Sequence, residues 1–406
     1  MENLVLEITK DAATAAGAAV EMVERKGTGH PDYICDAVME RISIELSRAY
    51  IERFGRVLHH NIDKGLLIAG QVEKHFGGGM VARPMEFIVG DRAAFASGGV
   101  KVPVADIARD AAISWFRENL RHIDPLRDIK IRVALQPGSA SLSDIFGRKG
   151  GVLAANDTSA AVGYAPLTPT EKVVYDLERH INSSAFKQEF PETGEDVKVM
   201  GIRTGRDIDL TVACPLMAGL IEGEGEYFKR KRAVLAAIKD CLSGITCKKS
   251  FNRMSAALNT LDVTGHGING VYLSLLGTSA EDADSGQVGR GNRVNGVISL
   301  NRPMGTEAAA GKNPVSHVGK IYSILSHIIA NEIYTDIDGV KEVYVWLLSR
   351  IGQDIDRPRC VHVRILSGRG IDKRAARKKV SAVLDNSFLR MEAFTSELAS
   401  GAFPVC

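Results

Sequence analysis

Short segments rich in branched residues lie in groups between amphipathic helices, and this order most constrains what the chain can fold into. Apolar residues recur at four-residue steps after Pro31, which predicts an amphipathic helix with Pro31 at its first position. These residues are Val38, Ile42, Leu46 and Tyr50. We therefore expect the residue before Pro31 to lie at the mouth of the helix.

Strands are expected where branched residues are bounded by Gly, Pro or Asp. They fall into three groups: residues 64–73, 84–93 and 128–138; residues 197–203 and 208–214; and residues 270–277, 295–301, 342–348 and 359–366. Further helices are expected at residues 172–181, 317–334 and 373–394. Residues 204–207 suit the connection of an antiparallel hairpin. Because the strands cluster in hairpins between helices, we expect an α+β fold rather than a doubly wound sheet.

Length and composition narrow the class of protein. A chain of 406 residues can bury a large core and form two or three domains or subdomains. No apolar run approaches the roughly 18 residues of a membrane span, and the first residues are not signal-like, so we expect a cytoplasmic location and no membrane partner. A net charge of +2 gives no basis for nucleic-acid binding. The six cysteines lack zinc spacing, which predicts free thiols.

Residues 284–320 combine glycines with fixed cations, which favours a polyphosphate-binding segment. Glycines allow backbone N–H groups to approach phosphate oxygens, and the cations can neutralise the charge. The cations are Arg290, Arg293, Lys312 and Lys320. A P-loop is excluded, because five residues separate Gly305 from Gly311 and Asn313 follows Lys312. A dinucleotide fingerprint fails as well, because Val294 stands at its third glycine. The alternative is a set of turns on a solvated face.

The sequence GTGHPD, residues 27–32, could place three kinds of chemistry in a small volume. His30 supplies a proton-bearing donor, the helix after it supplies a dipole that favours anions, and Asp32 supplies a carboxylate for a metal. Asp36 follows one helical turn after Asp32. The alternative is structural, with His30 as a helix cap and Asp32 as a favourable first-turn acid.

Asp196 and Lys198 lie two residues apart at a predicted strand, and we expect their side chains to share one face. The carboxylate could bind ribose hydroxyls while the ammonium binds a phosphate oxygen. A solvated cross-strand ion pair is the alternative. Two loops are weaker candidates: Asn156-Asp157, and the hydroxyl-rich segment 138–143.

Taken together and in this order, GTGHPD, GEDVK and GRGNR with GKNPVSHVGK resemble the S-adenosylmethionine synthetases, specifically their archaeal-type branch. The resemblance runs from about Glu21 to Asp356 and includes DKGLLIAGQ, FGGG, GDRA, NDTS, GYAPL, GTSAEDADSG and SRIGQ. It implies one synthetase of three interleaved, discontinuous α+β subdomains over residues 1–406. The implied reaction joins ATP and L-methionine to give S-adenosylmethionine, and the tripolyphosphate is then cleaved to diphosphate and phosphate.

The resemblance also implies roles for single residues. His30 would hydrogen-bond the leaving oxygen near C5′, and Asp32 would bind Mg²⁺. Asp196 would contact ribose, and Lys198 phosphate. Arg290 and Lys312 would grip the tripolyphosphate. Asp284 would bind the methionine ammonium, and Tyr272 would stack on adenine. The other ATP contacts that the resemblance implies are Gly138, Ser139, Ala140, Ser141, Leu142, Ser143, Asp157 and Lys320.

The chain departs from the bacterial and eukaryotic branch in the late motif. There it reads roughly GKDPSKVD, whereas here His317 replaces a lysine and Gly319 replaces a metal-binding aspartate. Two Mg²⁺ ions are expected at each site, and Glu307 is the candidate for the missing carboxylate because it lies in the same loop. Potassium stays an open alternative, because Gln71 and Val72 stand where the other branch carries Gly-Glu.

The resemblance further implies a homodimer with two shared active sites at its interface. Two rival functions need many of the same residues. A Mg²⁺-dependent phosphotransferase or NTPase would yield ADP or AMP, and a non-catalytic nucleotide sensor would not depend on His30.

Overall fold

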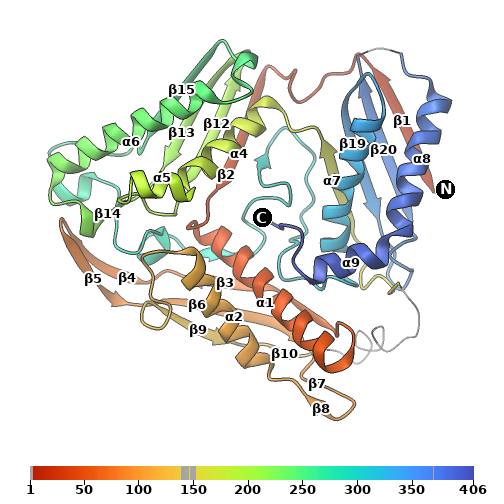
Figure 1. The fold of residues 1–406 in the computed structure, drawn as a ribbon, viewed down its shortest axis with the longest axis horizontal. Coiled ribbons are helices and arrows are strands. Elements are labelled where there is room, and N and C mark those ends of the chain that lie inside the picture. Colours follow the sequence, from red (N-terminus) through yellow and green to blue (C-terminus); the bar gives the residue numbers. More distant parts are fainter. Residues whose placement is uncertain (1–2, 139–145, 147–151, 369) are drawn as a thin grey trace.

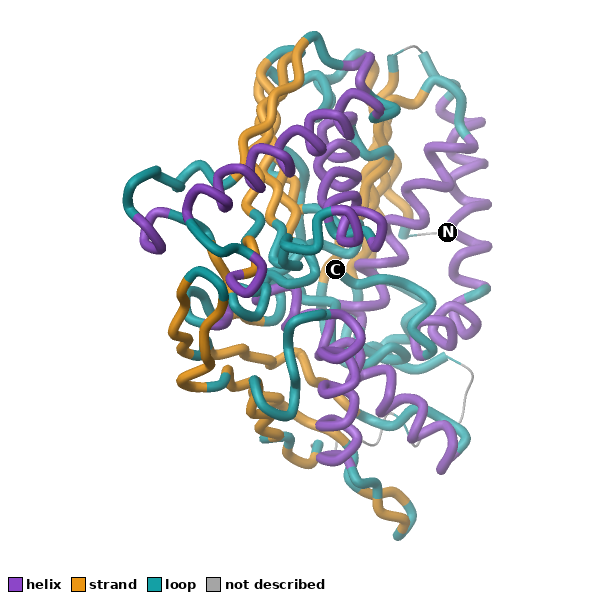
Figure 2. The backbone as a smooth tube through the Cα atoms, turned by 60° about the vertical axis from the view of Figure 1, so that its left-hand side comes forward, coloured by secondary structure: helices purple, strands orange, loops and turns teal. Residues whose placement is uncertain are grey.

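The computed structural model describes residues 3–138, 146, 152–368 and 370–406. Within these ranges the larger sheets are three, and helices cover each of them (Figure 1). Figure 2 shows the same three groups of strands from another side, with the helices beside them. None of the helices in these ranges has the length and apolar character needed to cross a membrane.

The first sheet carries the N-terminal helix. Its strands have the order β10-β6-β3-β17, and β9 also pairs with β6. They are β3 (His60–Ile68), β6 (Met85–Ala93), β9 (Ile129–Val133), β10 (Gln136–Pro137) and β17 (Gly286–Gln287). Helices α1 (Pro31–Phe54) and α2 (Val104–Asn119) pack on each other and on this sheet. The close approach of α1 requires Gly65, because a Cβ there would lie 2.6 Å from the Met39 side chain.

The second sheet has the order β15-β13-β12-β2-β18. Its strands are β2 (Val20–Lys26), β12 (Lys198–Thr204), β13 (Asp207–Ala213), β15 (Arg253–Leu258) and β18 (Ile298–Ser299). Helices α4 (Pro169–Ile181) and α6 (Glu224–Gly244) cover it. The N-terminus of α4 is fixed by a capping box between Thr168 and Glu171.

The third sheet has the order β1-β20-β19-β11, in which only the β1–β20 pair is parallel. Its strands are β1 (Leu4–Lys10), β11 (Ala160–Ala165), β19 (Val340–Leu348) and β20 (Cys360–Ser367). Helix α7 (Val318–Asp336) packs on β11 and β19, and α8 (Lys373–Leu389) packs on α7. Helix α9 (Met391–Ala399) then reaches α1 of the first sheet.

Short elements complete the fold. They are β4 (Gln71–His75), β5 (Gly78–Arg83), β7 (Ala96–Ser97), β8 (Val100–Lys101), β14 (Leu216–Met217), β16 (Leu273–Ser274) and α5 (Ser184–Glu189). Each large sheet takes strands from distant parts of the sequence, so the three units cannot be separated by cutting the chain at two points. The segment between β17 and α7 passes from the first sheet through the second to the third.

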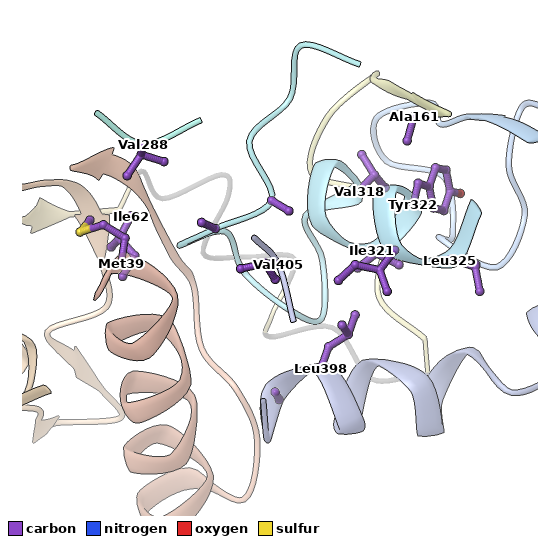
Figure 3. Packing of buried hydrophobic residues seen from close by; sticks show 14 of the residues in the cluster. Met39, Ile62, Ala161, Val288, Val318, Ile321, Tyr322, Leu325, Leu398 and Val405 are labelled. Atoms are coloured by element: carbon purple, nitrogen blue, oxygen red, sulfur yellow. The ribbon is translucent and has the colours of Figure 1, made fainter. Parts of the chain in front are cut away.

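Two features hold the units together. The buried Arg302 guanidinium hydrogen-bonds Glu171 of α4 at 3.2 Å and the Tyr344 hydroxyl of β19 at 2.8 Å, which joins the second sheet to the third. One large apolar cluster joins the first sheet to the third. Figure 3 shows this cluster, with Met39 and Ile62 near α1, Tyr322 on α7 and Val405 near the centre.

The expected α+β class and most long elements are confirmed. Helix α1 begins at Pro31 as predicted, and residues 204–207 close the β12–β13 hairpin, with Thr204 paired to Asp207. Residues 270–277 and 295–301 were expected to be strands, and this was wrong beyond two paired residues in each. In 270–277 the N–H groups of Tyr272, Leu275 and Leu276 donate to side chains instead of to a neighbouring strand. The helix expected at 373–394 breaks at Arg390 into α8 and α9.

Candidate active site

Three carboxylates run along one face of α1. Asp32, Asp36 and Glu40 are spaced four residues apart, so they lie one above the other on the helix, and all three are buried. Asp32 Oδ1 accepts a hydrogen bond from Gln287 N at 3.0 Å. Asp36 accepts two, from Gly289 N at 2.7 Å and Gly291 N at 3.0 Å. Glu40 Oε2 accepts one from Gly311 N at 3.0 Å.

This carboxylate row binds the glycine-rich segment that sequence analysis singled out, and it changes the role of the glycines. The expectation that their amides bind phosphate is wrong for Gly289, Gly291 and Gly311, whose N–H groups already bond to α1. The glycines instead permit close approach. A Cβ at Gly291 would collide with Asp36 Oδ2, and one at Gly311 would lie 2.5 Å from Ile62 O. Of the four cations in the segment, Lys312 and Lys320 pair with carboxylates and Arg293 bonds the Gly289 carbonyl, whereas Arg290 forms no ion pair with any described residue.

His30 is the N-cap of α1, and this fixes its tautomer. Its Nδ1 accepts a hydrogen bond from Asp32 N at 3.2 Å, so in the neutral ring the proton lies on Nε2. Burial, together with the Lys26 ammonium, lowers the pKa of His30 to about 4. At neutral pH the side chain is therefore an uncharged Nε2–H donor at the start of a helix. The capping role does not exclude the donor role, because each uses a different ring nitrogen.

A first cluster of charged groups surrounds His30 at the end of the second sheet. Lys26 is directly opposite Lys198 in the β2–β12 register. The Lys26 ammonium lies 2.9 Å from Asp32 Oδ2 and donates to Arg290 O at 2.7 Å, and the Lys198 ammonium lies 3.4 Å from Glu24 Oε1. Two lysines directly opposite each other repel, so their juxtaposition favours an anion as their partner.

Asp196 lies just before β12 and is buried. Its Oδ2 accepts hydrogen bonds from Ser279 N at 2.7 Å and Ser279 Oγ at 2.6 Å, and burial raises its pKa to about 7. The expectation that Asp196 and Lys198 share a strand face is wrong, because β12 begins only at Lys198. The alternative, a cross-strand ion pair, is formed by Lys198, whose ammonium lies 3.4 Å from Glu24 Oε1 on the neighbouring strand β2.

Two further candidates lie close to Asp196. The charge of Asp284 contributes to the raised pKa of Asp196. The pKa of Tyr272 is raised by its own burial and by the charge of Asp196. Asp284 is exposed and Tyr272 is half-buried. Asp284 N donates to Ser279 O at 3.0 Å, and Ser279 bonds the Asp196 carboxylate, so Asp284 and Asp196 are connected through one residue.

A second cluster lies near the N-terminus of α7. The buried Lys312 ammonium pairs with Glu307 and lies 3.2 Å from Asp63 Oδ2. Burial opposes ionisation of Asp63, but the Lys64 and Lys312 ammonium groups lower its pKa to about 2. His317 caps α7 through Nδ1, which accepts from Gly319 N at 3.2 Å.

Glu307 fills the space beside Gly319. A Cβ at Gly319 would lie 2.8 Å from Glu307 Oε2 and 3.2 Å from the His317 ring. A side chain at position 319 and the present position of the Glu307 carboxylate therefore exclude each other. The Glu307 carboxylate therefore occupies the space that the side chain of an aspartate at position 319 would need.

The comparisons with known proteins decide the family. The family model of S-adenosylmethionine synthetase (AdoMet synthetase) matches residues 2–402. The chain belongs to the S-adenosylmethionine synthetase family. It is 45% identical over 389 residues to the S-adenosylmethionine synthase of Caldivirga maquilingensis, covering 94% of each chain. It is 39% identical to that of Methanothermobacter thermautotrophicus, covering 99% of each.

A solved structure confirms the fold of this synthetase. The structure titled "Structure of an Unusual S-adenosylmethionine synthetase from Campylobacter jejuni" matches with a TM-score of 0.62 at 15% identity, covering 94% of each chain. The archaeal-type resemblance is confirmed as well, because archaeal synthases are among the relatives at 39–45% identity. The protein is therefore an S-adenosylmethionine synthase, a methionine adenosyltransferase, and the phosphotransferase and sensor alternatives are rejected.

Three of the expected ATP contacts of this synthetase have other neighbours. The Lys320 ammonium is fully buried and bonds both Glu40 oxygens, at 2.7 and 2.8 Å, and burial lowers its pKa. Gly138 packs against His59, where a Cβ would collide with Nδ1. Asp157 Oδ1 accepts from Thr158 N at 2.7 Å. Ser139, Ala140, Ser141, Leu142 and Ser143 lie outside the described residues.

Four residues of these clusters were not predicted from the sequence as site residues. Lys26, Glu40 and Asp63 contact candidate site residues, and Asp36 was noted only for its spacing. The four-residue spacing of Asp32, Asp36 and Glu40 was a visible signal for the carboxylate row. Lys26 had none, because its position depends on the register between β2 and β12.

The protonation state of His30 is a first prediction for this synthetase. Because burial and Lys26 disfavour the imidazolium, the ring stays neutral from pH 8 down to about 5, whereas free histidine titrates near pH 6.5. NMR of ¹³Cε1-labelled histidines, with His30→Asn to assign the signal, measures this directly. A midpoint near pH 6.5 for the His30 signal would contradict the environment described above.

Proposed function

We propose that the two clusters bind ATP and L-methionine and stabilise the tripolyphosphate as it leaves C5′. The methionine sulfur attacks C5′, the C5′–O bond breaks, and the tripolyphosphate is then hydrolysed to diphosphate and phosphate. No covalent nucleophile of the protein is needed. Catalysis rests on alignment of two reactants and on stabilisation of a highly charged leaving group. The observation that supports this best is the neutral Nε2–H donor of His30, which lies near the two lysines, Lys26 and Lys198, that stand opposite each other on β2 and β12.

The first cluster would act on the leaving oxygen. His30 Nε2–H would donate to the oxygen that departs from C5′, while Lys198 and Arg290 would bind phosphate oxygens. Arg290 is exposed and forms no ion pair with any described residue. Asp196 would accept from ribose hydroxyls, Tyr272 would stack on adenine, and Asp284 would bind the methionine ammonium. The backbone before Asp196 bonds to the backbone before His30, because Gly29 N donates to Glu195 O at 2.9 Å.

The second cluster would hold the far end of the triphosphate through Lys312. We propose that Lys320, Asp157 and residues 138–143 also contact ATP. For Lys320 this requires that its ammonium break its hydrogen bonds to Glu40. The family is typically Mg²⁺-dependent, and Mg²⁺ bound with the substrate would neutralise phosphate charge. Asp32 and Glu307 fit this role as carboxylates, each now paired with a lysine that a cation would displace. We propose two Mg²⁺ ions per site and leave potassium open.

If Glu307 supplies the metal-binding carboxylate that position 319 lacks, its removal should weaken Mg²⁺ binding. Glu307→Gln should raise the Mg²⁺ concentration needed for half-maximal rate by about tenfold, since a neutral amide is a poor Mg²⁺ ligand. The double variant Glu307→Gly with Gly319→Asp moves the carboxylate across the space they share, so it should recover much of the loss. Steady-state rates across a Mg²⁺ titration measure both. Gly225→Ala, at an open position in α6, is the control. Unchanged Mg²⁺ dependence in Glu307→Gln would exclude Glu307.

We also propose a homodimer with shared active sites. His30 and Lys312 lie in different clusters, and their anchors on α1, Asp32 and Glu40, are separated by roughly 12 Å of helix. Among the described residues no three acidic, histidine or cysteine groups are placed to hold one metal ion. We propose that each cluster is one half of an active site. Two chains packed together can complete both.

The sheet faces that lie away from the helices support this dimer. The residues of β2 and β12 that point to the outside alternate with the buried ones, and Lys26, Glu24 and Lys198 lie on that outer face. Apolar residues are exposed there and on β3: Met22 (40%), Ile202 (39%), Leu66 (38%) and Ile68 (36%). Exposed apolar sheet faces beside charged half-sites are typical of a protein–protein interface.

Complementation between inactive chains tests the shared sites. His30→Ala and Lys312→Ala, co-expressed with different tags and purified as heterodimers, should give about half of the wild-type activity, because one of the two sites then has no mutation. Heterodimers of His30→Ala with Arg290→Ala are the matched control. They should stay inactive, because both residues belong to the first cluster. No recovery with Lys312→Ala would mean that each site comes from one chain.

The three sheets with their helices correspond, in our proposal, to three discontinuous subdomains of one synthetase over residues 1–406. A cytoplasmic location is also proposed, because the six cysteines are free, as in a reducing compartment, and ATP is the substrate.

A further inference from the structure

We propose that Asp36 is a positioning residue for Arg290, holding the backbone around it so that the guanidinium points to the leaving tripolyphosphate. The inference rests on the proposed function, which assigns Arg290 to that group. Asp36 itself touches neither substrate nor metal in this account. It acts through two amide groups of the neighbouring loop.

The backbone on both sides of Arg290 is bonded to protein groups. Asp36 Oδ1 accepts from Gly289 N at 2.7 Å, and Oδ2 accepts from Gly291 N at 3.0 Å. The carbonyl of Arg290 accepts from the Lys26 ammonium at 2.7 Å, and Arg290 N donates to Gln287 O at 3.4 Å. One carboxylate therefore binds the amide N–H groups of both residues that flank Arg290.

The side chain of Arg290, unlike the backbone around it, is not bonded to described protein groups. It is exposed, and no described residue forms an ion pair or side-chain hydrogen bond with it. If Asp36 paired with the guanidinium directly, it would cancel the charge. By bonding to the backbone, it fixes the direction of the cation and leaves the charge for a ligand. A cation that is already oriented needs little reorganisation when charge develops on the leaving group.

Glu40 provides an internal comparison, because it is the same kind of group on the same helix face. It bonds to Gly311 N and Lys320, one helical turn beyond Asp36, and none of its contacts involve the Arg290 loop. A general loss of stability from removing a buried carboxylate should therefore appear for both residues. A specific effect on Arg290 should appear for Asp36 alone.

A double-mutant cycle separates these two effects. Asp36→Asn alone should lower kcat by about tenfold or more, because an amide cannot accept both N–H bonds and the loop shifts. The KM for ATP should change less. In the Arg290→Ala background, Asp36→Asn should lower kcat by less than about twofold, because the guanidinium that Asp36 orients is absent there. Glu40→Gln should cost the same factor with and without Arg290.

A second variant tests the clamp from the loop side, which keeps the test informative if Asp36→Asn does not fold. Gly291 has no positive φ, so Gly291→Ala changes little except that the new Cβ collides with Asp36 Oδ2. It should reproduce the kcat loss and the same dependence on Arg290. Gly225→Ala in α6, where nothing lies within 4 Å, should leave kcat unchanged.

Two results would overturn the inference, and they differ. If Arg290→Ala lowers kcat but Asp36→Asn and Gly291→Ala cost the same factor in both backgrounds, the positioning role is wrong while the proposed role of Arg290 stands. If Arg290→Ala leaves kcat unchanged, the assignment of Arg290 to the tripolyphosphate fails, and the inference fails with it.

Discussion

The hydrogen bonds from the carboxylates of α1 to the glycine-rich segment are the constraint on which the rest of the site depends. Burying a carboxylate raises the free energy of the folded state unless its oxygens accept hydrogen bonds. Here Asp32, Asp36 and Glu40 accept them from backbone N–H groups of the segment, which holds the segment against the helix. The segment leads from β17 of the first sheet to α7 of the third. The same bonds therefore join two units of the fold and set the positions of Arg290 and Lys312.

This arrangement divides the labour between backbone and side chains. The amides of the glycines satisfy the protein's own acids, so anion binding is left to Arg290, Lys198, Lys312 and the His30 donor. Side-chain cations suit a large leaving group with several charges, because long side chains from separate positions can each contact a different phosphate. Glycine is required at 289 and 311 because both have a positive φ, and at 291 because a Cβ there would collide with Asp36 Oδ2.

Much of the fold followed from local signals. Pro31 with an apolar four-residue period gave α1, and the position of His30 before it gave the cap. What failed depended on partners remote in sequence. Residues 295–301 have a strand-like composition, yet only Ile298 and Ser299 pair with β2. Lys320 looked like a phosphate ligand, but its ammonium bonds to Glu40 inside the core. No pattern near Lys26 or Asp63 shows that folding places them beside His30 and Lys312.

The most direct test of the central claim, that this site expels a whole tripolyphosphate, is a product analysis. The enzyme is incubated with ATP, L-methionine and Mg²⁺, and the adenine-containing and phosphorus-containing products are quantified. The account predicts S-adenosylmethionine with diphosphate and phosphate in equal amounts, and no adenine nucleotide product. Formation of ADP or AMP in proportion to phosphate release would contradict it.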